Sequence, residues 1–160
     1  MRQTLDAIEY AKATSVWTPW DLAQLAEANL KAGITEEGLV KVTEGQAIVD
    51  RFGQHFYEAE LHRIKGELLL QRARADQGAE NCLGGAECSF QQAIDIARQQ
   101  GAKSLELQAL TSLSRLRHYY GSSKQRKEAH QMLAEVYGWF TDGFDTTDLT
   151  EARVLLAELE

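Results

Sequence analysis

The feature that most constrains the fold is a pair of segments whose residues fit two helices packed on each other. The first segment, residues 59–70, has a small residue, Gly66, at its middle. The second, residues 86–94, places Ala86, Phe90 and Ala93 at steps of four and three, which puts them on one helical face. A small residue facing a small–large–small surface is typical of repeated helix pairs. Such a stack builds surfaces and does not by itself imply chemistry.

The small residues recur at a fixed interval along the chain. Ala23, Gly66 and Ala109 are each 43 residues apart, and each lies in the middle of an expected helix. This register favours a true repeat over chance matches in an alanine-rich chain. The same interval separates Ala86 from Ala129 and Phe90 from Leu133. In the first unit the corresponding face is Gly38, Val42 and Gly45, which makes the loop of that unit about five residues shorter.

Local signals set the ends of the helices. Thr18 is expected to cap a helix that has Pro19 at its first position and Asp21 in its first turn. Thr35 is expected to cap the next helix. Helix ends are predicted at Gly33, Gly53 and Gly101.

A single proline in 160 residues, with abundant Ala, Leu, Glu, Gln and Arg, is typical of a helical protein. We expect an all-α fold of antiparallel helical hairpins stacked as a short α-solenoid, and short connections support this arrangement. About eight helices are expected, at residues 4–13, 19–32, 36–52, 54–75, 86–100, 102–119, 124–139 and from 147 onward, with a polar, glycine-bearing loop at 76–85.

These helices form one predicted domain. Residues 1–16 are the remnant of a preceding repeat, and residues 141–160 form a capping helix, which Trp139, Phe140 and Phe144 are expected to lock onto the helix before it. The helix pairs between them cover residues 17–53, 54–101 and 102–140.

The charge of the chain excludes several kinds of partner. Seventeen basic and 24 acidic residues give a net charge of −7, which disfavours nucleic acid and anionic membranes. No apolar run approaches the roughly 18 residues of a membrane span. The N-terminus lacks the apolar core of a signal peptide, so a cytoplasmic location is expected.

No catalytic, metal-binding or cofactor-binding constellation stands out. Cys82 and Cys88 are expected to be reduced thiols, since nothing else indicates an oxidising compartment. Cys88 near His62 or His130 would suggest a nucleophile, but a buried or half-buried inert thiol is the expected arrangement. The chain is therefore expected not to be an enzyme and to need no cofactor.

Three stretches, residues 58–71, 86–106 and 136–149, are similar to one family. They resemble the C-terminal tetratricopeptide-repeat (TPR) region of bacterial signalling proteins that carry a class III adenylate/guanylate cyclase or a DNA-binding activator domain, then an AAA-type ATPase. The resemblance covers about residues 15–160. It implies that any cyclase or ATPase activity resides in upstream domains, and that this chain is a fragment or short relative of the C-terminal end.

These observations predict a non-catalytic module that binds a protein or peptide, or upstream domains of its own polypeptide. An alternative is an effector-sensing arm that controls cyclic-nucleotide synthesis or transcription. Self-association through the N-terminal helix is also expected.

The first helix of each pair should line the concave side of the stack. Trp17 and Trp20 share a helical face there and would be peptide anchors, unless they pack against the first helix. The predicted groove consists of Trp17, Trp20, Gln24, Glu27, Glu60, Arg63, Glu67, Gln71, Lys103 and Glu106.

Overall fold

The computed structural model describes residues 18–75 and 80–159. All regular structure within these two ranges is helical, which confirms the all-α prediction. The first expected helix and Trp17 lie outside the described residues. The α-helices are α2 (Pro19–Ala32), α3 (Thr35–Phe52), α4 (Glu58–Ala75), α5 (Glu80–Gln100), α6 (Lys103–Tyr120), α7 (Ser123–Tyr137) and α8 (Thr147–Leu159), and a short 3₁₀ helix, η1, covers His55–Tyr57.

Several predicted helix boundaries are confirmed. Thr18 and Asp21 form a reciprocal capping box, in which the Asp21 N–H donates to Thr18 Oγ1 and the Thr18 N–H donates to Asp21 Oδ2. Gly33, Gly53 and Gly101, the three predicted ends, all have a positive φ. A side chain at such a left-handed position would be strained, so glycine ends these helices at low cost.

Two local predictions are wrong. Thr35 is the first residue of α3 and not its cap; its hydroxyl donates to Gln71 Oε1 of α4 at 2.6 Å. The loop expected at 76–85 is shorter, because α5 begins at Glu80 and includes Gly84 and Gly85. In both places a contact with α4 outweighs the local preference of the sequence for a cap or a loop. Thr35 bonds to Gln71. At Gly85 the two helices approach so closely that an added methyl group would lie 3.3 Å from Leu69 of α4.

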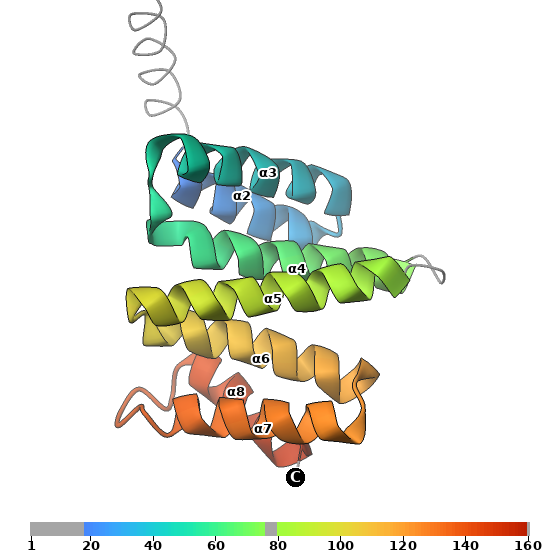
Figure 1. The fold of residues 1–160 in the computed structure, drawn as a ribbon, viewed down its shortest axis with the longest axis vertical. Coiled ribbons are helices and arrows are strands. Elements are labelled where there is room, and N and C mark those ends of the chain that lie inside the picture. Colours follow the sequence, from blue (N-terminus) through green and yellow to red (C-terminus); the bar gives the residue numbers. More distant parts are fainter. Residues whose placement is uncertain (1–17, 76–79, 160) are drawn as a thin grey trace, which may run out of the picture.

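The helices are stacked along the longest axis of the molecule, from α2 and α3 at one end to α7 and α8 at the other (Figure 1). Each helix packs on the next in sequence, and α2, α4, α6 and α8 also contact one another in series. Among the described helices, no contact of that extent joins α3 to α5 or α5 to α7. The even-numbered helices are therefore drawn closer together than α3, α5 and α7.

The predicted packing of Gly66 on Phe90 is confirmed. Both residues are buried, and a methyl group added to Gly66 would overlap the ring, 2.6 Å from Phe90 Cδ1. The other positions that the repeat pattern singled out are also buried, namely Ala23, Gly38, Val42, Gly45, Ala86, Ala93, Ala109, Ala129 and Leu133.

The C-terminal aromatic residues agree with the prediction only in part. Phe140 and Tyr137 pack against the core cluster that contains Leu149 and Leu155 of α8. Trp139 is 60% exposed, its ring meets that of Phe140 edge-on, and it is not among the residues packed on the core cluster that holds α8. Phe144 is also largely exposed, although its ring lies 5.7 Å from that of Tyr137.

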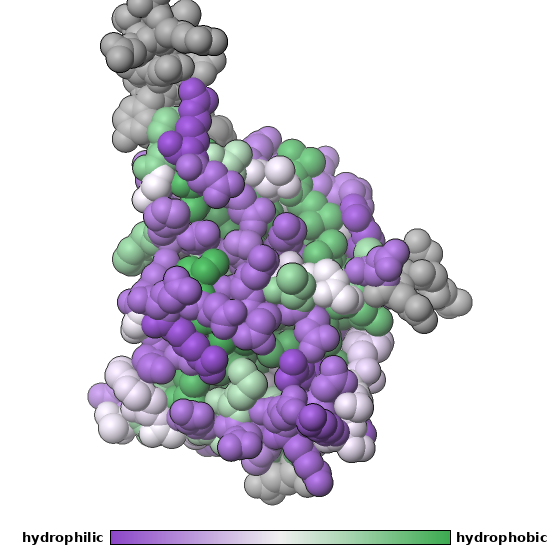
Figure 2. Space-filling view, in the orientation of Figure 1, coloured by the Kyte–Doolittle hydropathy of each residue, from purple (hydrophilic) through white to green (hydrophobic). Residues whose placement is uncertain are grey.

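The face over α3, α5 and α7 is mostly hydrophilic, with small scattered hydrophobic patches (Figure 2). None of the described helices is both long enough and apolar enough to cross a membrane.

Candidate functional site

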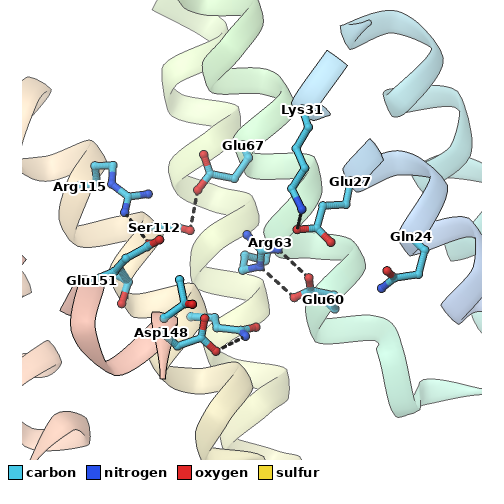
Figure 3. A pocket seen from close by; sticks show the side chains of 13 residues that line it. Gln24, Glu27, Lys31, Glu60, Arg63, Glu67, Ser112, Arg115, Asp148 and Glu151 are labelled. Carbon is cyan, nitrogen blue, oxygen red and sulfur yellow. Dashed lines mark hydrogen bonds and ion pairs between the residues drawn. The ribbon is translucent and has the colours of Figure 1, made fainter. Parts of the chain in front are cut away.

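A groove of about 520 Å³ opens on the side of the molecule formed by the even-numbered helices (Figure 3). All four of these helices contribute to its walls. The lining residues are Gln24, Glu27 and Lys31 of α2; Glu60, Arg63 and Glu67 of α4; Gln108, Thr111, Ser112 and Arg115 of α6; and Thr147, Asp148 and Glu151 of α8.

Arg63 is the most buried cation of the groove and is held by Glu60. Its Nε and Nη2 donate to the two carboxylate oxygens of Glu60 at 2.8 and 2.6 Å. Burial lowers the pKa of Arg63, but the bonds to Glu60 and the nearby charges of Glu67 and Glu27 raise it further, so the net shift is upward. A bidentate pair of this kind keeps Arg63 charged and fixed in place.

The other two cations lie nearer to solvent. Lys31 Nζ lies 3.1 Å from Glu27, one turn away on α2. Arg115 Nη2 donates to Glu151 Oε2 at 3.1 Å, which joins α6 to α8. Exposed pairs of this type contribute only about 0–1 kcal/mol, and their side chains rearrange easily.

Two carboxylates have only uncharged partners. Ser112 donates to Glu67 Oε1 at 2.6 Å, and Gln108 donates to Asp148 Oδ2 at 2.6 Å. Across the described residues, no cation lies within 4 Å of either carboxylate. The groove therefore contains three ion pairs and two further negative charges.

The floor of the groove is built from small polar side chains of α6. Thr111 and Ser112 are both buried, and the Thr111 hydroxyl donates to the Leu107 carbonyl at 2.8 Å. Their hydroxyl protons are used internally, and their small volume leaves space above them. The groove thus offers hydrogen-bonding and ion-pairing groups, and neither Cys nor His lines it.

Five predicted groove residues, Gln24, Glu27, Glu60, Arg63 and Glu67, lie together in this groove. The other described ones lie elsewhere. Trp20 is partly exposed beside a separate cleft of about 500 Å³ that Pro19, Phe56 and Tyr57 also line. Gln71 accepts from Thr35 and donates to the Leu30 carbonyl, so it connects α4 to α2 and α3.

Lys103 and Glu106 do not line the groove, contrary to the prediction. Glu106 is 2% exposed and accepts from Arg98 of α5 and from Lys103, each at 2.7 Å. Burial raises the pKa of Glu106, but these two hydrogen bonds outweigh burial and lower it below its ordinary value. The three residues hold α5 against α6.

The prediction assigned α6 the wrong residues, Lys103 and Glu106, and it missed α8 because it treats residues 141–160 only as a capping helix. One signal was present in the sequence: a polar stripe at steps of three and four on α6 marks a face that is not core. That stripe is Gln108, Thr111, Ser112 and Arg115.

The residues considered for other chemistry do not assemble into a site. Cys82 is half-buried and Cys88 is exposed, so the expected burial of Cys88 is wrong. Within 18–75 and 80–159, no three His, Cys, Asp or Glu side chains lie close enough to hold a metal ion.

Comparison with protein families, with curated proteins and with solved structures finds no match to the chain.

Proposed function

We propose that the chain is a protein-interaction module, a TPR-like stack of helical hairpins whose groove binds a segment of another protein. The observation that carries this proposal is the groove itself, to which four successive even-numbered helices contribute polar side chains. A long open surface lined by side chains from several repeats suits an extended or helical peptide better than a small molecule.

The module would act as a regulatory part of a larger signalling protein or assembly in the cytoplasm, with no catalytic role of its own. The resemblance of residues 58–71, 86–106 and 136–149 to the C-terminal region of cyclase-linked and activator-linked ATPases supports this role. In that arrangement the groove would bind either a separate protein or the upstream domains.

Selection from a random dodecapeptide library displayed on phage tests the proposal without assuming a partner. Gln108→Trp places a bulky ring in the groove, whereas Gln99→Trp adds the same ring at an exposed position of α5 that does not line it. We expect the selected peptides to bind the wild type and Gln99→Trp equally. Binding to Gln108→Trp should be about tenfold weaker, because a filled groove excludes contacts of about 1.4 kcal/mol or more.

Far-ultraviolet circular dichroism establishes that both variants are folded. Failure to select any peptide, or equal binding by the two tryptophan variants, would contradict a peptide-binding groove.

A further inference from the structure

We infer that the partner segment is basic, and that its lysine or arginine side chains pair with Glu67 and Asp148. This inference rests on the proposed function and specifies the chemistry of the partner.

The charge balance of the groove is the first argument. Its three cations, Lys31, Arg63 and Arg115, are each paired with a carboxylate of the groove, Glu27, Glu60 and Glu151 respectively. Glu67 and Asp148 remain as two further negative charges that form no ion pair within the described residues, although Glu67 lies near enough to Arg63 to help raise its pKa. A ligand that brings positive charge would complete the pairing.

The orientation of these two carboxylates is the second argument. Each has one oxygen bonded to an uncharged donor, Ser112 for Glu67 and Gln108 for Asp148, and the other oxygen accepts no hydrogen bond from the described residues. Ser112 is 4% exposed, so its bond to Glu67 is shielded from water. The donors thus hold the carboxylates in place without neutralising them, which lowers the cost of ordering them on binding.

Glu67 and Asp148 come from different helices, α4 and α8, and Figure 3 shows them on either side of Ser112 in the groove. Their hydrogen-bond donors, Ser112 and Gln108, are four residues apart on α6, so two cationic side chains of one segment could each pair with one carboxylate. This separation favours a peptide over a single small cation.

The same geometry disfavours an acidic partner. Arg63 already donates to both oxygens of Glu60, and the two other cations of the groove are paired as well. An acidic segment would have to displace the carboxylates that pair with these cations. It would also be repelled by the carboxylates of Glu67 and Asp148. The net charge of −7 of the whole chain acts in the same direction at longer range.

The library selection described above is also the test of this inference. Peptides that depend on the groove, judged by Gln108→Trp, should be enriched in lysine and arginine. Each is then resynthesised with those residues replaced by glutamine, and both forms are titrated by fluorescence anisotropy. We expect the glutamine forms to bind about tenfold more weakly, as is typical when complementary charges are removed.

Two matched double variants of the protein show which of its charges contribute to peptide binding. Glu67→Gln with Asp148→Asn removes two groove charges and keeps an oxygen to accept from Ser112 and Gln108. Glu37→Gln with Glu135→Gln removes two charges from exposed positions that do not line the groove. We expect the first pair to weaken binding about tenfold and the second pair less than twofold, and the difference to shrink with added salt.

Two results would overturn the inference. Equal weakening by both double variants would show that only net charge attracts the peptides. Groove-dependent peptides that are neutral or acidic would also overturn it, while leaving the proposed peptide-binding function intact. Absence of any groove-dependent peptide would instead contradict the proposed function.

Discussion

The two sides of α4 pack on their neighbours in opposite ways. Toward α3, the helix presents large side chains, Leu61 and Leu68, which fill the space left by glycines of α3. Toward α5 it presents Gly66, and the large side chain, Phe90, comes from the neighbour. Both interfaces therefore pair small residues with large ones. The large side chains belong to α4 at the α3–α4 interface and to α5 at the α4–α5 interface.

The two contacts differ in rigidity. A methyl group on Gly38 would lie 2.7 Å from Leu68 Cδ2, and one on Gly45 would lie 2.9 Å from Leu61 Cδ2. Both atoms are the free ends of flexible side chains. At Gly66 the obstacle is the ring of Phe90, whose atoms move only together. The α4–α5 interface therefore specifies its packing more strictly than the α3–α4 interface.

The largest difference between the interfaces should appear when their central large residues are truncated. Phe90 and Val42 hold equivalent positions, because each is the large residue between two small ones on the inner face of its helix, and both are fully buried. Phe90→Ala is expected to lower the free energy of unfolding by about 3–5 kcal/mol, because it leaves a ring-sized cavity. Val42→Ala removes two methyl groups and should cost about 1.5–2 kcal/mol. Urea unfolding followed by circular dichroism measures both; equal losses would refute the stated asymmetry.

The polar contacts at the α5–α6 and α3–α4 interfaces differ as well, and their contributions to stability should depend differently on pH. Glu106, which joins α6 to α5, is a buried carboxylate whose pKa is lowered because the hydrogen bonds from Lys103 and Arg98 outweigh burial. A carboxyl with a lower pKa in the folded state stabilises the fold above its unfolded pKa, about 4.3. That contribution is lost as the pH falls through the folded value.

Glu106→Gln is therefore expected to cost about 1.5–3 kcal/mol at pH 7, the range for hydrogen bonds to charged groups. The cost should shrink progressively below about pH 4, because the contribution of the charged Glu106 is lost as the pH falls from the unfolded pKa through the lower pKa of the folded state. Urea unfolding at a series of pH values provides the measurement.

Thr35→Val is the matched control from the α3–α4 region, where Thr35 and Gln71 make an uncharged bond. Its cost, about 1 kcal/mol, should be the same at every pH. A pH-independent cost for Glu106→Gln would show that the Glu106 charge does not stabilise the α5–α6 contact.

A smaller effect is expected from adding one methyl group to each glycine contact. Gly66→Ala forces the Phe90 ring to move, and the overpacking cost of about 1–3 kcal/mol exceeds the gain of about 1 kcal/mol in helix propensity. The atoms nearest to the methyl group of Gly38→Ala are at the flexible end of Leu68, which can move aside. The overpacking cost and the gain in helix propensity should therefore nearly cancel. Thermal and urea unfolding measure both variants.

Phe90→Leu in the Gly66→Ala background tests whether overlap with the Phe90 ring causes the loss of stability. The smaller side chain should recover part of the lost stability, giving a coupling between the two sites. Strict additivity of the two substitutions would contradict direct contact between them.

The helix boundaries that the sequence predicted correctly are those with a local cause. Thr18 and Asp21 contact each other across three residues, and Gly33, Gly53 and Gly101 require only their own backbone conformation. The extra turns of α5 could not be predicted in this way. Gly84 and Gly85 cost helix stability locally, and packing of α5 along α4 compensates for them.

The groove could be predicted only in part. Glu60–Arg63 on α4 and Lys103–Glu106 on α6 are equivalent ion pairs, 43 residues apart, with the signs exchanged. Only the first pair lines the groove. The second turns toward Arg98, which lies on α5 across the turn between the two helices, so the pattern within α6 does not indicate this contact.

The sequence alone determined that this chain is helical, where most helices end, and which small and large residues face the core, because these properties depend on neighbouring residues and on helical periodicity. The tertiary structure decided which helices approach one another most closely, and so which polar side chains share a groove. Side chains of α2, α4, α6 and α8 meet there across more than a hundred residues of chain, and Glu67 and Asp148 acquire their uncharged partners only when those helices are packed together.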